Sequence, residues 1–210
     1  MNMMQAAPKA GAAGVRLVDD LPELSALQEP DCAAAIWHRQ MPQAFSTWIN
    51  ALPVDQLPRA RVVLRPHDVA QTLSDLCTKA GMPDRMERRW FEEDVAQMSA
   101  SFAAIMDAPY LRLRLDVIET NACRKFHIDA IKARLICTYR GTATQYGNGS
   151  REIGPSEIFT LETGSPMVMR GTRWPEHPSA ALLHRSPPIE GTGETRLVLV
   201  LDPVETMDDC

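Results

Sequence analysis

The spacing of apolar residues changes near residue 109. Before it, apolar side chains recur every three or four positions, as Trp90, Val95, Met98 and Phe102 do, and this spacing predicts amphipathic helices. From residue 110 to 117, apolar residues alternate with polar ones, which is the period of a half-buried strand. The pattern therefore predicts a helical first half and a β-rich second half.

Helix start and stop signals divide the first half. The predicted helices are a segment through Ile36 and Trp37 capped by Asp31, a segment begun by Pro42 that includes Phe45 and Trp48, residues 69–79 capped by Asp68, and a long segment from Pro83 to Met106. Residues 61–64 form a short apolar run between prolines, which predicts one strand.

The second half has the pattern of a β-rich unit. The predicted strands cover residues 110–117, 133–139, 157–161, 167–170, 181–185 and 196–201. Clusters of Gly, Pro, Asn and Ser separate them, and the Gly-Asn-Gly-Ser sequence at 147–150 is predicted to be a turn. Short strands with turns between them and no intervening helices favour a sandwich or a barrel.

These elements fit a single α+β domain over residues 31–210. Helices within 31–107 are predicted to support one side of a β-barrel formed by 110–202, and residues 1–30 are predicted to be a flexible N-terminal arm. The arm lacks the continuous apolar stretch of a signal peptide. No apolar run reaches the ~20 residues of a membrane-spanning helix, so a cytoplasmic location without a membrane partner is expected.

Composition narrows the class of protein. With 210 residues, 45% of them hydrophobic, the chain can bury a substantial core. The net charge of −5 argues against a general nucleic-acid-binding role, which requires a basic face. Five cysteines at wide spacings, with no Cys-x-x-Cys pair, argue against a zinc ribbon and against a disulfide framework.

Two histidines and one aspartate form the candidate metal site. His127 and Asp129 are two positions apart, so on an extended segment both side chains project from the same face. His184 follows on a predicted strand, and His177, in a predicted loop, is the rival third ligand. Two imidazoles and one carboxylate make the facial triad of non-haem Fe(II) oxygenases, which leaves coordination positions open for a co-substrate and O₂.

Arg196 is the candidate co-substrate ligand. It begins the last predicted strand and shares a face with Val198 and Val200, so burial would require a partner for its guanidinium. A dicarboxylate that binds the metal at one end and Arg196 at the other would supply that partner. The competing interpretation pairs Arg196 with an internal acid such as Glu157 or Glu162.

The order His127-Ile-Asp129, His184, Arg196 resembles the HxD…H…R pattern of the Fe(II)/2-oxoglutarate-dependent dioxygenases. The resemblance implies a double-stranded β-helix, which is a jelly-roll and cupin-like fold. It also implies Fe(II) on the two histidines and the aspartate, and 2-oxoglutarate on Arg196. Many of these enzymes carry a small hydroxyl residue two positions after the arginine, where this chain has Val198. Thr138 and Tyr139 are predicted to replace that hydroxyl, and Arg134 and Arg140 are rival ligands for the co-substrate carboxylate.

A closer resemblance covers residues 30–202. The segments Lys-Phe-His-Ile-Asp at 125–129, Cys-Thr-Tyr-Arg-Gly-Thr at 137–142 and His-Arg-Ser-Pro-Pro at 184–188, followed by Gly-Thr-Gly at 191–193, are similar to the bacterial domain-of-unknown-function 1826 family. Members of that family are sometimes encoded near zinc-responsive metallochaperone GTPases, which implies a link to metal limitation.

Three functions follow from these observations. The first is an Fe(II)/2-oxoglutarate-dependent dioxygenase that hydroxylates or oxidatively demethylates a small-molecule or macromolecular substrate. The second is a cupin-like protein that binds Zn(II) without redox activity, because imidazole and carboxylate ligands also suit zinc. The third is a structural or partner-binding β-domain without a metal. The pattern leaves the substrate and the oligomeric state open.

Overall fold

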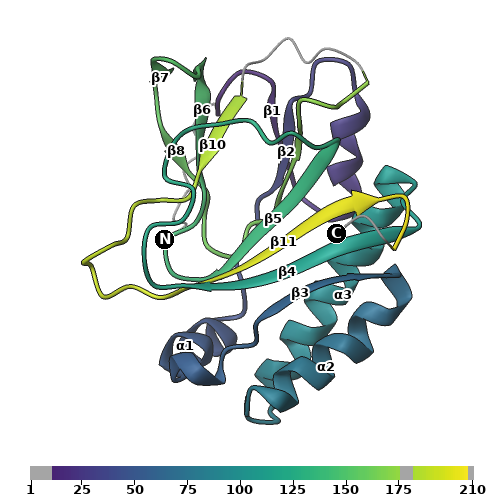
Figure 1. Cartoon of the computed structure of the whole chain (residues 1–210), viewed down its shortest axis with the longest axis vertical. Coiled ribbons are helices and arrows are strands. Elements are labelled where there is room, and N and C mark those ends of the chain that lie inside the picture. The colour runs from purple at the N-terminus through teal and green to yellow at the C-terminus, as the bar shows by residue number, and fades with distance from the viewer. Residues whose placement is uncertain (1–10, 176–181, 208–210) are drawn as a thin grey trace, which may run out of the picture.

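The computed structural model describes residues 11–175 and 182–207, in which two β-sheets face each other (Figure 1). The larger sheet has the order β1-β2-β9-β5-β11-β4-β3, and the smaller has β10-β6-β7 with β8 beside β6. All pairs are antiparallel except β1–β2. The strands are β1 Val15–Val18, β2 Ala34–Trp37, β3 Ala60–Leu64, β4 Tyr110–Ile118, β5 Ala133–Arg140, β6 Gln145–Ser150, β7 Gly154–Pro155, β8 Phe159–Thr160, β9 Met167–Arg170, β10 Leu182–Arg185 and β11 Arg196–Val204.

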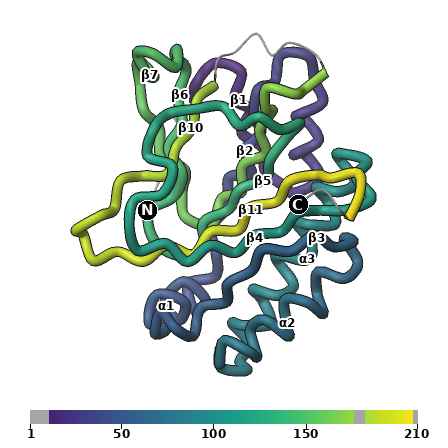
Figure 2. Tube along the Cα trace, viewed as in Figure 1, coloured from purple at the N-terminus to yellow at the C-terminus, as the bar shows by residue number. Residues whose placement is uncertain are grey.

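The strands of the second half alternate between the two sheets. From β5 the chain passes to β6 and β8 in the smaller sheet, returns with β9, crosses again to β10 and ends on β11. The trace in Figure 2 shows β6 and β10 on the opposite side of the barrel from β5 and β11. This winding is the double-stranded β-helix, and it confirms the predicted α+β jelly-roll.

Three α-helices cover the outer face of the larger sheet: α1 Gln43–Ala51, α2 Val69–Lys79 and α3 Met86–Met106. Leucines on one face of β4 and of β11, such as Leu113 and Leu199, are buried in a core that also holds Phe91 and Phe102 of α3. The helices predicted after Pro42, Asp68 and Pro83 are confirmed, although α3 begins three residues after Pro83. None of the described helices combines the length and apolarity needed to cross a bilayer.

Two predictions for the N-terminal region are wrong. Residues 34–37 form β2 instead of a helix, and this strand lies between β1 and β9 in the sheet and is buried on both faces. Periodicity alone does not distinguish a short buried strand from a buried helical segment. The predicted arm contains β1 and a 3₁₀ helix, Pro22–Gln28, whose Leu24 and Leu27 are fully buried. The larger sheet therefore extends beyond 110–202.

The predicted turn at residues 147–150 is also wrong. These residues belong to β6, which pairs with β10, β7 and β8. A Cβ atom on Gly147 would lie 2.1 Å from the carbonyl oxygen of Glu157, so the glycine allows another backbone segment to approach closely. Of the strand predicted over residues 157–161, only residues 159–160 are a strand in the structure, and they form β8.

A buried ionic network joins the helices to the sheet. Asp94 of α3 accepts hydrogen bonds from Arg39 Nη2 at 2.7 Å and from the Tyr139 hydroxyl of β5 at 2.6 Å. The side chains of Arg39 and Asp94 are only 10% and 8% exposed, and burial raises the pKa of Tyr139 well above its ordinary value. The carboxylate of Asp94 thus balances a guanidinium that is largely shielded from water.

Replacing Asp94 with alanine is expected to lower the free energy of unfolding by about 3–5 kcal/mol, because it leaves the buried Arg39 charge without its partner. Urea unfolding followed by circular dichroism measures the loss. The matched control is Asp84→Ala, whose ion pair with Arg89 is about two-thirds exposed and is worth at most about 1 kcal/mol. Equal losses in the two variants would contradict this account of the network.

Candidate metal centre

Backbone pairing brings the two histidines together. The amide of His127 donates to the carbonyl of His184, and the amide of His184 donates to the carbonyl of His127, both at 3.0 Å. His184 lies on β10, whereas His127 lies in the connection before β5, so this one antiparallel bridge joins two distant parts of the chain. The imidazole centroids are 4.5 Å apart.

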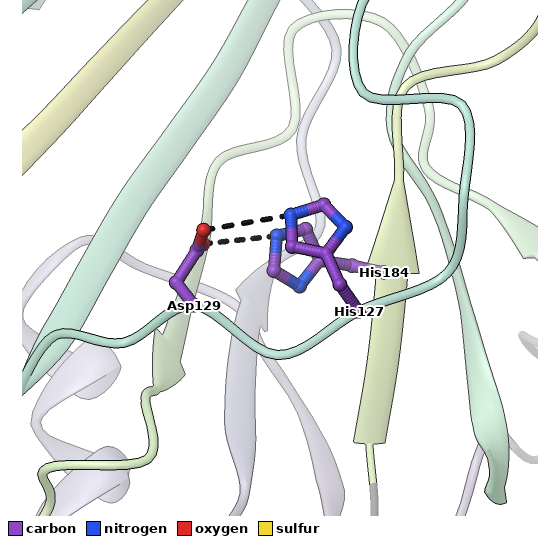
Figure 3. A group of neighbouring side chains, drawn as sticks. All are labelled: His127, Asp129 and His184. Atoms are coloured by element: carbon purple, nitrogen blue, oxygen red, sulfur yellow. Dashed lines mark ion pairs between the residues drawn. The ribbon is translucent and has the colours of Figure 1, made fainter. Parts of the chain in front are cut away.

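Asp129 completes the group. Figure 3 shows both imidazoles directed toward its carboxylate. His127 Nε2 lies 3.5 Å from Oδ1, and His184 Nε2 lies 3.0 Å from Oδ2. The carbonyl of Asp129 accepts from the Thr172 amide at 2.9 Å, and a Cβ on Gly171 would lie 2.1 Å from the Ile131 carbonyl, so a tight backbone contact holds this loop.

A second contact orients His127. Its Nδ1 lies 2.8 Å from the carbonyl oxygen of Lys125, which can only accept a hydrogen bond. The contact therefore favours the tautomer with the proton on Nδ1, and the lone pair of Nε2 then points toward Asp129. Metal-binding histidines show this same arrangement of a ligating nitrogen and an outer hydrogen bond.

The protonation states of His184 and Asp129 suit a metal. Burial lowers the pKa of His184, which favours the neutral imidazole. The contact with Asp129 raises the pKa of His127, which favours its protonated form, so an ion that binds there displaces that proton. Burial alone would raise the pKa of Asp129, but the adjacent imidazoles and the Arg134 charge outweigh it and hold that pKa well below its ordinary value. An ionised carboxylate beside a neutral imidazole is the form that ligates a cation.

The residues fit a divalent ion. One donor atom from each of His127, Asp129 and His184 lies within 4.8 Å of the others, and the carboxylate of Asp129 is mostly buried, with Arg134 Nη1 2.6 Å from its Oδ2. Two nitrogens and one oxygen match Fe(II) or Zn(II). The three side chains border a cavity of about 120 Å³, called here the metal cavity. Its other walls include Arg114, Asp116, Ile118, Ala122, Cys123, Arg134, Ile136, Thr144, Arg185, Ser186, Val198 and Val200.

Arg196 is one of the most deeply buried side chains, with 1% of its surface exposed. Its Nε donates to the carbonyl of Thr142 at 2.6 Å. Among residues 11–175 and 182–207, neither terminal nitrogen, Nη1 or Nη2, has a hydrogen-bond partner. Burial lowers the pKa of Arg196 to about 10. A guanidinium with two unsatisfied nitrogens in the interior is costly unless a ligand binds it.

Thr138 presents a second unsatisfied group on the same side of the sheet. It lies opposite Val198 in the β5–β11 pairing, next to the position of Arg196 on that face. Its hydroxyl is buried, and no described residue makes a hydrogen bond to it. Two positions after Arg196, this chain has Val198 in place of a hydroxyl residue. Thr138 faces Val198 on the neighbouring strand and carries a hydroxyl there.

The structure separates Tyr139 from this group. The β5–β11 register shifts between Leu197 and Val198, so Tyr139 is an extra residue between Thr138 and Arg140. Its ring lies in the core beneath the helices, and its hydroxyl is bonded to Asp94. The prediction that Tyr139 binds the co-substrate is therefore wrong, because the bulge turns the side chain to the other face.

The rival arginines are engaged within the chain. Arg140 donates to the carbonyls of Ile49 and Leu52 beside α1, away from the metal cavity. Arg134 holds both oxygens of Asp202, at 2.7 and 2.8 Å, and its Nη1 lies 2.6 Å from Asp129 Oδ2. Arg134 therefore positions the carboxylate of Asp129, and its bidentate partner is Asp202 instead of a co-substrate. His177 lies outside the described residues.

Sequence reasoning missed several side chains that line the metal cavity. Arg114 and Asp116 come from β4, and Arg185 and Ser186 follow His184 directly. The sequence carries a signal for Arg114 and Asp116, because the alternation in residues 110–117 places both side chains on the face opposite the leucines. The alternation predicts a half-buried strand, and the structure shows that its polar face lines the cavity.

Fold and site together define a class: a double-stranded β-helix with two histidines and one carboxylate gathered beside an internal cavity. Within that class, the chain belongs to the family described as "Protein of unknown function (DUF1826)", whose profile matches residues 18–202. The predicted resemblance to this family is thereby confirmed. No curated protein sequence matches the chain.

Solved structures with the same fold include plant dioxygenases. The dioxygenase for auxin oxidation 1 from Arabidopsis thaliana, in its complex with 2-oxoglutarate, is 8% identical, with a TM-score of 0.53 over 92% of this chain and 93% of that one. The dioxygenase for auxin oxidation in rice is 11% identical, with a TM-score of 0.50 over 93% and 84% of the two chains. At these identities the likeness shows the fold alone.

Proposed function

We propose that this protein is a non-haem Fe(II)/2-oxoglutarate-dependent dioxygenase that hydroxylates or oxidatively demethylates its substrate. The observation that carries the proposal is the pair of buried, unsatisfied groups on the face that lines the metal cavity. The Nη atoms of Arg196 and the hydroxyl of Thr138 have no hydrogen-bond partner in the described chain. A carboxylate of 2-oxoglutarate would satisfy both, because a guanidinium and a hydroxyl both donate to carboxylate oxygens.

Each residue has a role that follows from its contacts. His127, Asp129 and His184 would hold the ion, with Lys125 fixing the tautomer of His127 and Arg134 fixing the carboxylate of Asp129. Arg196 and Thr138 would orient 2-oxoglutarate toward the ion. Fe(II) bound there would supply the oxidising chemistry, with one oxygen atom of O₂ ending in succinate as 2-oxoglutarate loses CO₂ and the other in the oxidised substrate. Val198 and Val200 provide apolar walls on the β11 side of the cavity.

The test is turnover of 2-oxoglutarate without added substrate. Anaerobic addition of Fe(II) and 2-oxoglutarate should produce a weak visible charge-transfer band, and admission of O₂ should then yield slow, uncoupled formation of succinate. A sample with a chelator in place of Fe(II) is the control. Tight Zn(II) binding with neither signal would favour the cupin-like protein without redox activity, and a protein that takes up no metal would contradict both metal functions.

A further inference from the structure

A second hollow, larger than the metal cavity, lies farther along the same face of the sheet. It has a volume of about 380 Å³ and is bordered by residues of β3, β4, β5 and β11. Arg61, Arg112, Arg114 and Arg134 line it, and we call it the arginine groove. Arg114 and Arg134 also line the metal cavity, so the two hollows share walls.

The arginine groove concentrates positive charge in a chain whose net charge is −5. Within the described part of the chain, Asp202 is the one carboxylate among its lining residues. Arg134 occupies both oxygens of Asp202, and Arg112 and Arg114 approach the same carboxylate only to 4.0 and 3.9 Å. Arg134 also pairs with Asp129 of the metal cavity, so Asp202 is the carboxylate that borders the groove beside four guanidinium groups.

The arrangement of these arginines is unfavourable without a ligand. Arg61 of β3 lies directly opposite Arg114 of β4 in the strand pairing, and like charges at facing positions destabilise a sheet. The Nε of Arg114 is buried and has no hydrogen-bond partner within residues 11–175 and 182–207. Burial and the charge of Arg134 both lower the pKa of Arg114. A bound anion would relieve this repulsion between the arginines.

We propose that the arginine groove binds an oxyanion, a phosphate or a carboxylate, carried by a small-molecule substrate. Guanidinium forks match both groups in geometry, and the volume of the groove is in the range of small-molecule sites. Because the groove shares Arg114 and Arg134 with the metal cavity, an anion held there would place the rest of the molecule beside His127, Asp129 and His184. The oxidation of that molecule rests on the proposed function, whereas the binding of the anion does not.

The experiment measures oxyanion binding by isothermal titration calorimetry on the full chain without added metal, at constant ionic strength. The probes are inorganic phosphate, pyrophosphate and tricarballylate, which separate phosphate from carboxylate recognition. The variant Arg61→Gln with Arg114→Gln should weaken the better-bound probe about 10-fold or more, since two charged hydrogen-bond donors are lost. The matched control is Arg89→Gln, an exposed arginine of α3 that makes the same change in charge and should leave the affinity unchanged.

Folding is checked on the same samples by circular dichroism and thermal unfolding. If the double variant does not fold, Arg61→Gln alone tests the groove, because Arg61 is exposed and lies outside the metal cavity. A loss of about 3-fold or more is then expected, because one charged donor is removed. An affinity that Arg61→Gln leaves intact would overturn the proposal, as would a wild-type protein that binds none of the three probes.

Two further outcomes separate this inference from the proposed function. Arginine-dependent oxyanion binding by a protein that neither holds metal nor forms succinate would support the groove and contradict the dioxygenase. Succinate formation without oxyanion binding would support the dioxygenase and overturn the groove. A 20-nucleotide single-stranded DNA that binds through the same arginines more tightly than pyrophosphate, with a steep salt dependence, would overturn the assignment to a small molecule.

Discussion

Replacement of His184 by alanine is expected to abolish stoichiometric binding of Fe(II) or Zn(II). The side chain provides one of the three donor atoms that converge within 4.8 Å. The backbone bridge to His127 fixes the position of residue 184, and an alanine there has no ligand atom. Changes in residues that merely support a metal ligand cost about 10–100-fold in affinity, so loss of a ligand should cost more than 100-fold. Anaerobic titration with metal analysis of the dialysed protein measures the effect.

The same loss is expected for His127→Ala and for Asp129→Ala. The matched control is His38→Ala, since His38 is a half-exposed histidine paired with Glu162 and should leave metal affinity unchanged. Near-normal metal binding in His127→Ala would remove that residue from the ligand set. Loss of binding in His38→Ala as well would point to general destabilisation instead of a local site.

The second large effect concerns Arg196. Its replacement by alanine should weaken 2-oxoglutarate binding by roughly 2–5 kcal/mol, the cost of breaking one buried, hydrogen-bonded charge pair. Metal affinity should stay nearly unchanged, because Arg196 is not among the three converging ligands. Lysine should restore only part of the loss, since an ammonium group does not form the two parallel hydrogen bonds of a guanidinium. Titration with 2-oxoglutarate in the presence of Mn(II) provides the measurement.

Thermal unfolding of the metal-free variant separates binding from stability. If Arg196 served only the fold, Arg196→Ala would lower the melting temperature and leave 2-oxoglutarate affinity untouched. The unsatisfied Nη atoms predict that 2-oxoglutarate affinity falls, whatever stability is lost with the Nε bond to the Thr142 carbonyl and with the buried side chain. Tyr139→Phe is the control for affinity, since its hydroxyl bonds Asp94 on the helical side of the sheet.

Much of the secondary structure could be predicted because local pattern and tertiary environment agree. In β4, leucines alternate with polar residues and pack against the helices, so the period of two is preserved. In α1 and α2, the start signals and apolar spacing coincide with the buried face. The convergence of His127, Asp129 and His184 could also be predicted, because a spacing of two and a strand setting constrain where the side chains project.

Other elements could not be predicted from local pattern. Strand β2 has no alternation because both of its faces are buried, Ala35 in one core cluster and Ala34 and Ile36 in the other. Its four residues therefore resemble a buried helix as much as a strand. The glycines of β6 have the local pattern of a turn. Their actual role is to allow a neighbouring backbone segment to approach closely, which only the tertiary structure shows. Leu24 and Leu27 are three residues apart, which is the period of a 3₁₀ helix, but one such turn does not by itself predict burial. Their place in the common core explains it.

The sequence by itself determined the change of period at residue 109, the strand with alternating leucines and the same-face pairing of His127 with Asp129. These depend on residues close together in the chain, whose geometry the backbone sets. Only the tertiary structure decided that the polar face of β4 lines the interior, that a bulge turns Tyr139 toward Asp94, and that Arg61 faces Arg114. The physical reason is that the face a side chain occupies, and the charges it meets there, depend on strand pairings between segments far apart in sequence.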